Sequence, residues 1–443
     1  MKICFVNQPW TVAAPPIGSD STGIWSYQIG KCLARHCQVT YYGSADDSNS
    51  SKNRQYNLNL SNRIEYRPIS PKIDLSLDVV RKVVTKLNFG SKIPYFGATS
   101  FHFGYGWQVA QDAARQNCDI IHIHNFSQFV PIIRRYNPKA KIILHLHCEW
   151  VNRLDQKAIA SRLEKADLVI SCSDYITNKI ETRFPKHAEI CRTINNGVVA
   201  DYFVPGKDDL LQQDRAVPQI LFVGRISPEK GIHDLIDAFT KITEKYPQAI
   251  LTIAGPHVIV AKEFLFDLQH EPEVQALEPF YKENYLEYIK SKIPAHLASQ
   301  IIFTGSLSQP KLLPYYQRAD VVINPSLSEA FGMSLIEAMA TQTPVVATKI
   351  GGMPEIIEDG VTGKIVDHGN PQAIADAAIA IISDPQKAAA MGKAGRTRVL
   401  QHYSWSKIAK NLIDSYADIG VKLNFDETQT TVARALSSAN RAD

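Results

Sequence analysis

The sequence predicts an α/β protein built from two doubly wound domains. Short apolar segments with strand character alternate with longer segments of helical periodicity, which is typical of parallel sheets covered by helices. This alternation stops at a polar, proline-containing stretch from about 200 to 218 and then begins again. At 443 residues the chain is long enough for two or three domains. Because doubly wound sheets bind ligands beyond the carboxyl ends of their strands, we expect a site in a cleft between the two domains.

The first domain is predicted to span residues 1–205. Its expected strands are short runs rich in β-branched and aromatic residues, as strands buried on both faces usually are. In chain order they are predicted at 2–6, 39–42, 120–124, 141–147, 168–171 and near residue 190.

The second domain is predicted to span residues 218–400. Its strands are expected at 219–223, 250–255, 301–305, 321–324 and 344–347. Residues 424–443 are polar and lack periodicity, which predicts a flexible tail.

Composition excludes several classes of protein. The formal net charge of +4 is too small, for a chain of this length, to indicate nucleic-acid binding. No apolar run reaches the roughly 18 residues of a membrane span, and Met1 leads directly into a predicted strand, so we expect no signal peptide. The seven cysteines are odd in number and form no Cys-x-x-Cys pair. This pattern favours reduced thiols in a cytoplasmic protein over a disulfide framework or a zinc site.

The most informative segment is 328–340. It follows a buried strand and places Glu329 in a turn and Glu337 inside a helix that is expected to begin near Gly332. A helix start offers backbone N–H groups and a positive dipole end, which suit a phosphate. Carboxylates beside such a site accept hydrogen bonds from paired hydroxyls. A phosphate between two hydroxyl-rich groups is the chemistry of a nucleotide sugar.

This segment resembles the Glu-x7-Glu signature of the retaining family-4 glycosyltransferases, which have the GT-B fold of two Rossmann-like domains facing across a cleft. Further motifs agree in order along the chain. Residues 222–225 with 229–231 resemble the family's basic segment for the donor phosphates, and 343–347 with 351–355 resemble the segments after its second Glu. The resemblance is nearly continuous in the C-terminal half and is one of pattern in the N-terminal half. It implies that a last helix, at 405–420, crosses back to the first domain.

The resemblance implies a role for each motif residue. Arg225 and Lys230 would hold the departing diphosphate, Glu329 would bind hydroxyls of the donor sugar, and Glu337 those of the ribose. The backbone at Gly332, Met333 and Ser334 would hold the pyrophosphate, and the segment at Gly305 would recognise the base. The residue types suit these roles, because Arg forks onto phosphate oxygens while Lys acts as a point charge. The alternatives are solvated salt bridges for the cations and ordinary helix-terminal positions for the acids.

Two His-x-His pairs stand on predicted strands, and alternation places the members of each pair on one face. The pairs are His122 with His124 and His145 with His147. The resemblance implies that His147, at the carboxyl end of its strand, contacts the donor sugar and supports the reaction. For the other histidines, core positions with satisfied hydrogen bonds and a zinc site both stay open. We expect no catalytic metal, since the Asp-x-Asp triplet of metal-dependent glycosyltransferases is absent.

Three departures from the family pattern are visible. A turn predicted at Gly23 resembles the glycine-rich loop after the first strand, but Thr22 stands where a second glycine is usual. Gln342 replaces a glycine that commonly precedes the Thr-Pro-Val-Val segment, and Val199 replaces an acidic residue often found after Asn-Gly-Val.

Together these residues predict a retaining, metal-independent glycosyltransferase that needs no cofactor. Its donor would be a UDP-, GDP- or ADP-linked sugar, and its acceptor a glycan, a lipid-linked molecule or a small molecule in cell-surface glycan or glycoconjugate synthesis. The alternatives are a catalytically silent scaffold that binds sugar nucleotides, or another GT-B enzyme such as a nucleotide-sugar epimerase or a phosphorylase. A dinucleotide oxidoreductase is disfavoured, because neither domain's first strand leads into Gly-x-Gly-x-x-Gly.

One segment of the first domain suggests a membrane contact. In residues 52–92, Lys and Arg outnumber the acidic residues, and apolar residues recur at helical spacing from 73 to 88. A basic amphipathic helix can lie on an anionic membrane, at the inner face in a cytoplasmic protein. The alternative is a surface helix that packs its apolar stripe on the sheet.

Overall fold

A computed structural model describes residues 1–13, 20–45, 63–77, 95–206, 217–266 and 271–423. The chain divides into two compact units after Asn195, and the segment from Asn196 to Ser404 forms the second unit. The helix α18 (Trp405–Asp418) belongs to the first unit. The division therefore falls before the linker expected at 200–218. The tail predicted at 424–443 lies outside the described residues.

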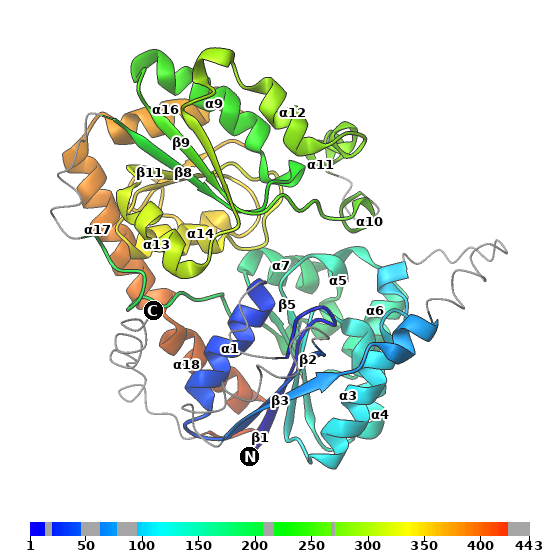
Figure 1. Cartoon of the computed structure of the whole chain (residues 1–443). Helices are drawn as coiled ribbons and strands as arrows, with labels where there is room; N and C mark the ends of the chain where they lie inside the picture. Colours follow the sequence, from blue (N-terminus) through cyan, green and yellow to red (C-terminus); the bar gives the residue numbers. More distant parts are fainter. Residues whose placement is uncertain (14–19, 46–62, 78–94, 207–216, 267–270, 424–443) are drawn as a thin grey trace. The chain divides into compact units, whose positions relative to one another are not determined.

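The first unit contains a seven-stranded parallel sheet (Figure 1). Its strands are β1 (Lys2–Val6), β2 (Gln38–Ser44), β3 (Ile64–Ile69), β4 (Ile120–His124), β5 (Lys141–Leu146), β6 (Leu168–Ser171) and β7 (Cys191–Thr193). They lie in the order β3-β2-β1-β4-β5-β6-β7, so the order reverses at the neighbouring strands β1 and β4. This reversal is the usual ligand-binding position of a doubly wound sheet.

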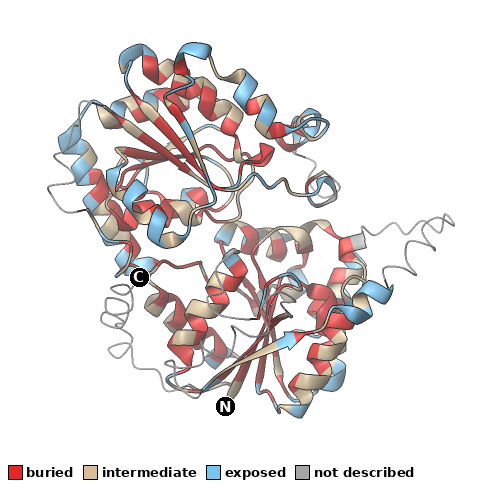
Figure 2. Ribbon diagram, in the orientation of Figure 1, coloured by how far each residue is buried: buried red, intermediate tan, exposed pale blue. Residues whose placement is uncertain are grey.

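Helices connect these parallel strands. They are α1 (Ser21–Leu33), α3 (Phe103–Arg115), α4 (Val130–Tyr136), α5 (Trp150–Arg153), α6 (Gln156–Leu163) and α7 (Asp174–Arg183), with the short 3-10 helices Tyr95–Gly97, Ser127–Phe129 and Pro185–Ile190. Helix α18 packs against α1. Every residue of the central strand β4 is buried. In both units the strands are mainly buried, while the helices have exposed residues on their outer sides (Figure 2).

The second unit contains a six-stranded parallel sheet. Its strands are β8 (Gln219–Val223), β9 (Ile250–Ala254), β10 (Ile301–Gly305), β11 (Val321–Asn324), β12 (Val345–Thr348) and β13 (Lys364–Val366). They lie in the order β10-β9-β8-β11-β12-β13, so the reversal here falls between β8 and β11. In the buried core, apolar side chains of these strands pack with apolar side chains of the surrounding helices. Phe239 and Ile374 are two of the helix residues in this core.

The helices of the second unit are α9 (Ile232–Lys245), α10 (Lys262–Leu265), α11 (Pro272–Gln275), α12 (Tyr285–Lys292), α13 (Gln309–Arg318), α14 (Met333–Ala340), α15 (Met353–Ile356), α16 (Pro371–Ile382) and α17 (Pro385–His402). Short 3-10 helices span Pro228–Lys230, Glu278–Tyr281 and Ala295–Leu297. Side-chain caps fix several helix starts in both units, because each oxygen accepts an otherwise unpaired N–H of the first turn. The capping residues include Asp20, Asp155, Ser173, Asn370 and Asp384.

The predicted strands are confirmed, but two edge strands were missed. Strand β3 carries Glu65, Arg67 and Pro68, which break the apolar pattern expected of a strand. An edge strand tolerates proline and charge, since one side of it needs no ladder hydrogen bonds. Strand β13 spans only Lys364–Val366, too short to show a pattern.

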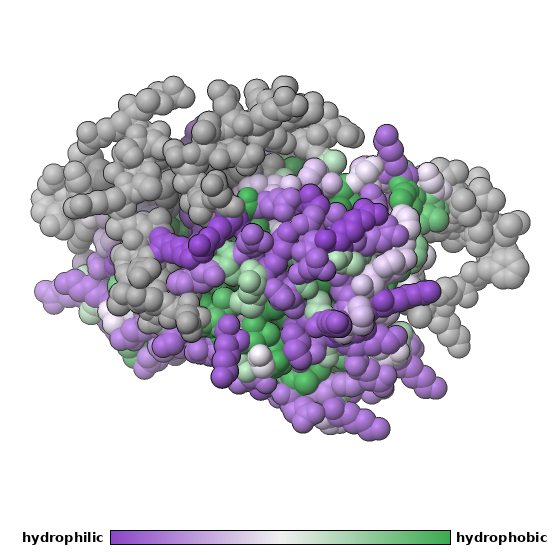
Figure 3. Space-filling model, turned by 90° about the horizontal axis from the view of Figure 1, so that it is seen from below, coloured by the Kyte–Doolittle hydropathy of each residue, from purple (hydrophilic) through white to green (hydrophobic). Residues whose placement is uncertain are grey.

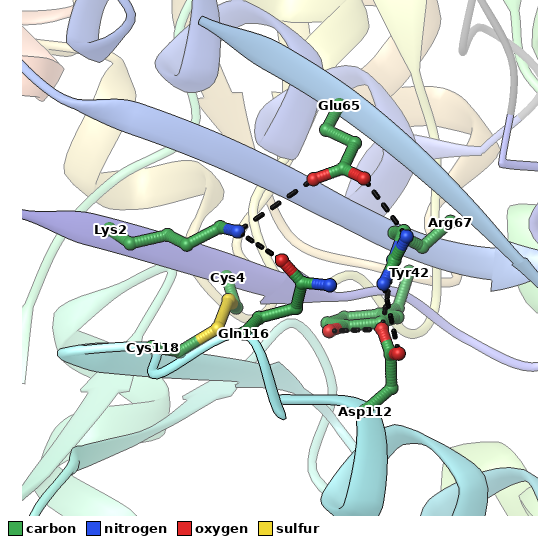
Figure 4. A network of polar contacts seen from close by, with 8 residues as sticks. All are labelled: Lys2, Cys4, Tyr42, Glu65, Arg67, Asp112, Gln116 and Cys118. Carbon is green, nitrogen blue, oxygen red and sulfur yellow. Dashed lines mark hydrogen bonds and ion pairs between the residues drawn. A yellow bond between two sulfur atoms is a disulfide. The ribbon is translucent and has the colours of Figure 1, made fainter. Parts of the chain in front are cut away.

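The cysteine prediction is wrong for one pair, because Cys4 and Cys118 form a disulfide. Cys4 lies in β1, and Cys118 shortly precedes the neighbouring strand β4. The two are 114 residues apart in sequence, so spacing alone gave no sign of the pair. Figure 4 shows the disulfide beside a polar network in which Arg67 forks onto Asp112 at 2.8 and 2.9 Å. Because two of the seven cysteines are paired, the cysteines no longer support the prediction of a cytoplasmic protein.

The predicted membrane segment is described only in part. Residues 72–77 are helical, and most of the predicted helix 73–88 lies outside the described residues. Asp74 accepts the backbone N–H groups of Gly104 and Tyr105, which fixes the described part to the start of α3. In the described ranges, no helix combines the length and hydropathy that crossing a bilayer requires. Among the residues that Figure 3 colours by hydropathy, most are hydrophilic and a smaller area is hydrophobic.

Candidate active site

The second unit gathers three charged residues at the carboxyl edge of its sheet. Arg225 and Lys230 follow β8, and Glu329 follows β11. These two strands are parallel neighbours, with Val321 opposite Ile220, so the loops after them emerge at the same edge. This is where the strand order reverses, which is the position at which doubly wound sheets bind ligands.

A short ion pair joins the two loops. Lys230 Nζ lies 2.7 Å from Glu329 Oε2, and both side chains are largely buried. Burial by itself would raise the pKa of Glu329. The charge and hydrogen bond of Lys230, the backbone N–H of Phe331 and the charge of Arg225 outweigh it, and together they lower that pKa. Glu329 is therefore a carboxylate at neutral pH, ready to accept hydrogen bonds from hydroxyls.

Glu229 is a site residue that the sequence reasoning did not single out. Its side chain is buried, and Oε1 accepts from Arg225 Nη2 at 3.1 Å and from Ser227 Oγ at 2.5 Å. Its backbone carbonyl accepts the N–H groups of Leu327 and Ser328, which lead to Glu329. Glu229 thus orients Arg225 and ties the basic loop to the acidic loop. The signal was its place inside the quoted motif, directly before Lys230.

Two glycines let these loops approach each other. Gly231 has φ +66°, and a Cβ there would stand 2.1 Å from the carbonyl oxygen of Pro325. Gly351 has φ +58°, and a Cβ there would stand 1.6 Å from the carbonyl oxygen of Glu329. The positive φ disfavours a side chain at both positions, and the close approaches exclude one. The backbone that carries Lys230 and Glu329 is therefore set by close contacts that only glycine allows.

Helix α14 begins at Met333, as predicted, with Gly332 as its N-cap at φ +113°. The N–H groups of a helix's first turn have no partner inside the helix, so Gly332, Met333 and Ser334 lie where an anion can be bound. Glu337 is buried one turn further along α14.

The surroundings of Glu337 raise its pKa. Tyr316 of α13 donates a 2.7 Å hydrogen bond to Glu337 Oε2. Burial raises the pKa of Glu337 to about 7, although the Tyr316 hydrogen bond acts in the opposite direction. Glu337 therefore changes its charge near neutral pH. Tyr316 is a second residue that sequence reasoning missed, and nothing in its local sequence marks it.

Gly305 and Gly23, the two other glycines predicted for the site, lie in different units of the chain. Gly305 ends β10, and its carbonyl oxygen accepts the N–H of Gly255, which packs against Gly224 beside Arg225. The turn expected at Gly23 is wrong, because Gly23 lies in the first turn of α1, where its N–H donates to Asp20 Oδ1. Asp20 starts the helix before Gly23, so this N–H serves the cap.

The four histidines form an array on one face of β4 and β5 in the first unit. His122 Nε2 lies 3.1 Å from His145 Nδ1, and His124 Nδ1 lies 3.0 Å from His147 Nε2. The His145 and His147 rings lie with their centroids 4.0 Å apart and are tilted by 35° to each other. Tyr416 of α18 bonds His122, and Ser26 of α1 bonds His124.

Burial is the main reason why the pKa values of His122, His124 and His145 lie well below the usual range. These three rings are therefore neutral. They also place ring nitrogens within 4.8 Å of one another, which is the arrangement that raised the question of a metal. The contacts inside each pair have hydrogen-bond lengths, and Tyr416 and Ser26 supply uncharged partners. Hydrogen bonds therefore join the array into two imidazole pairs, while His145 Nε2 is buried without a hydrogen-bond partner among the described residues.

Comparison with known proteins agrees with this architecture. The family model for Glycosyl transferases group 1 matches residues 210–398, and the model for Glycosyltransferase Family 4 matches residues 24–202. The chain is a group 1 glycosyltransferase. The enzyme class, and the use of nucleotide sugars that the class implies, are therefore as the motifs predicted.

Curated relatives of this glycosyltransferase include two bacterial proteins. Spore coat protein SA of Bacillus subtilis is 26% identical over 326 residues, which cover 70% of this chain and 81% of that protein. Lipopolysaccharide 1,2-N-acetylglucosaminetransferase of Salmonella typhimurium is 26% identical over 422 residues, or 92% of this chain and 96% of that enzyme. The second relative spans both units.

Solved structures confirm the GT-B fold. Anabaena Alr3699/HepE in complex with UDP aligns with a TM-score of 0.66 at 19% identity, covering 94% of this chain and all of that one. Sucrose-phosphate synthase from Thermosynechococcus elongatus aligns with a TM-score of 0.69 at 22% identity, covering 95% and 99%.

Proposed function

We propose that this glycosyltransferase is a retaining, metal-independent enzyme that transfers a sugar from a nucleoside diphosphate to a hydroxyl acceptor. The observation that supports this most directly is the set of Arg225, Lys230 and Glu329 at the strand-order reversal of the second unit, next to the start of α14.

The two cations supply the charge that sugar transfer requires. Negative charge develops on the diphosphate as the sugar departs, and fixed cations stabilise it most when they are already in place. Arg225 is held by Glu229 and Lys230 by Glu329, so their orientation precedes donor binding. The first turn of α14 provides N–H groups for the second half of the pyrophosphate.

The carboxylates orient the rest of the donor. Glu329 accepts hydrogen bonds from hydroxyls of the transferred sugar, and Glu337 accepts them from the ribose. His147 of the first unit contacts the sugar. Anabaena HepE was also solved with UDP-glucose, which makes UDP-sugars the first donors to test.

We infer a front-side displacement for the chemical step. The bond from the anomeric carbon to the phosphate oxygen breaks, and the acceptor oxygen bonds to the same face of that carbon. The acceptor's hydroxyl proton passes to the departing phosphate oxygen, which Arg225 and Lys230 hold. Configuration is retained, and no enzyme nucleophile is required.

The acceptor molecule and the cellular location of the protein stay predictions. A glycan, lipid-linked or small-molecule hydroxyl in cell-surface glycan or glycoconjugate synthesis fits the reaction. Contact of residues 52–92 with the inner face of a membrane would bring a lipid-linked acceptor within reach. Co-sedimentation with anionic liposomes at low salt tests that contact, and an absence of binding would exclude it.

The experiment begins with a thermal-shift screen of UDP-, GDP- and ADP-sugars with and without EDTA, because a ligand at 100 times its Kd adds about 2.7 kcal/mol of stability. Nucleotide release from the donor that binds then measures turnover. Arg225→Ala and Lys230→Ala should each lower it by about 10²-fold or more. Lys292→Ala is the matched control, since Lys292 forms an ion pair of the same 2.7 Å length with Asp237 outside the site. Near-normal turnover in both site variants would refute the proposal, and a donor bound without turnover would favour the silent scaffold.

A further inference from the structure

We propose that His124 is a positioning residue that sets the tautomer and ring orientation of His147, with Ser26 and Asn7 holding His124 in turn. The proposal rests on the proposed function in one respect, the contact between His147 and the donor sugar. Its structural part depends only on contacts inside the first unit.

The inference starts from the single hydrogen of the Ser26 hydroxyl. Ser26 Oγ lies 2.5 Å from Asn7 Oδ1, 2.9 Å from the carbonyl oxygen of Thr22 and 2.9 Å from His124 Nε2. With Asn7 Oδ1 facing the hydroxyl, both oxygens only accept hydrogen bonds, so the hydroxyl donates to one of them. The third contact then needs its hydrogen from the ring. This orientation of the Asn7 amide therefore places the His124 proton on Nε2.

This tautomer determines the next one. A neutral His124 with its proton on Nε2 presents a lone pair at Nδ1. His147 Nε2 lies 3.0 Å from that lone pair, so it must supply the hydrogen of this bond. His147 is left with a lone pair on Nδ1. A histidine in this form can accept a hydrogen bond at Nδ1 and cannot donate one there.

The main chain of His147 is held from the same strand. Asn125 follows His124 directly, and its Oδ1 accepts the His147 backbone N–H at 2.7 Å. Asn125 has φ +60°, a left-handed conformation that asparagine adopts more readily than most residues. The carboxyl end of β4 thus holds both the ring and the backbone of His147, which lies just past the end of β5.

His122 distinguishes positioning from simple core packing. It lies on the same strand and the same face as His124, and both side chains are fully buried. Its ring nitrogens bond Tyr416 and His145, and neither bonds His147. Identical substitutions at the two sites therefore create similar cavities, while only one removes the partner of His147.

Nitrogen-15 spectra of the histidines test the tautomers in the wild-type protein. We expect His124 and His147 each to show a protonated Nε2 and an unprotonated Nδ1, with signals assigned by single His→Asn substitutions. A proton on Nδ1 of His147 would overturn the proposal.

Turnover tests the functional part, read as nucleotide release from the donor. In His124→Leu we expect kcat to fall about 10- to 100-fold, the scale for a misplaced catalytic group, with KM nearly unchanged. His124→Asn should recover most of the loss, because its Oδ1 replaces the Nδ1 lone pair. His122→Leu should stay close to wild type. Equal losses in the two Leu variants, or no recovery in His124→Asn, would overturn the proposal.

His147→Ala separates this proposal from the proposed function. If it lowers kcat at least as far as His124→Leu does, the role of His147 stands and the comparison of the Leu variants decides the role of His124. If His147→Ala turns over normally, its contact with the sugar is refuted, and the functional part of this proposal falls with it. The tautomers are then still decided by the spectra.

Discussion

Replacing Glu337 with Gln should make the protein more stable at alkaline pH and, at the same time, weaken donor binding. Burial lifts the pKa of Glu337 from an ordinary value of 4.5 to about 7. Such a shift corresponds to about 3 kcal/mol, because each pKa unit equals about 1.4 kcal/mol. The buried side chain is 8% exposed, so solvent screening of this cost is small.

The sign is set by the direction of the shift. Below the unfolded pKa the carboxyl is protonated in both states and costs nothing. Between about 4.5 and 7 the unfolded chain ionises while the folded protein holds the proton, so the free energy of unfolding falls as pH rises. Above about 7 the full cost is present. Gln cannot ionise, and its amide oxygen can still accept from Tyr316.

Calorimetry of the wild type and Glu337→Gln at pH 5 and pH 8 checks this. At pH 8 we expect the variant's second unit to melt about 6 to 12 °C higher, since about 1 kcal/mol shifts Tm by about 2–4 °C for a unit of this size. The gain should largely vanish at pH 5. Glu287→Gln on α12 is the control, because its exposed carboxylate should give a small, pH-independent change. A gain of equal size at both pH values, or a loss at both, would show that Glu337 is not a buried acid that ionises near neutrality.

Two further substitutions test the backbone contacts of the site and the disulfide. Gly351→Ala should lower Tm and cut nucleotide release at least about tenfold, because its Cβ would overlap the Glu329 carbonyl. The control is Gly369→Ala, since Gly369 has a similar positive φ but no neighbour within 4 Å of a Cβ; an equal loss there would assign the effect to backbone strain alone. Cys118→Ser removes the bond to Cys4, so it should lower the free energy of unfolding by about 2–5 kcal/mol while leaving nucleotide release intact. The control is Cys191→Ser, which removes a free buried thiol. Equal melting temperatures of the two variants would contradict a stabilising disulfide.

The sequence correctly predicted those parts of the site whose reactive residues and backbone conformation are both determined within one short segment. The loop with Glu329, the start of α14 near Gly332 and the basic loop after β8 are all local, so residue order determines their shape. Gln342 shows how a departure from the family pattern can be explained afterwards. Its φ is +63°, a left-handed conformation that glycine adopts freely, which is a physical reason for the glycine commonly found there.

Contacts between distant segments were beyond the reach of sequence patterns. Tyr316 meets Glu337 only because α13 and α14 pack together, and Cys4 meets Cys118 only because β1 and β4 are neighbours. Alternation did predict that each His-x-His pair shares a face. It could not predict that the bonds run diagonally, from His124 to His147, because that depends on the register of β4 against β5.

The two cations of the site differ in how firmly their carboxylates hold them. Glu229 is buried and bonds one nitrogen of Arg225, whose side chain is still 43% exposed. A guanidinium has five N–H donors, so Arg225 can bind a phosphate without leaving Glu229. Lys230 is largely buried against Glu329, where the attraction between the charges is stronger than in water. An arriving diphosphate must share Lys230 with Glu329, and any loosening of that pair releases a carboxylate oxygen for a sugar hydroxyl. Binding of the diphosphate and orientation of the sugar would therefore be coupled through a single ion pair.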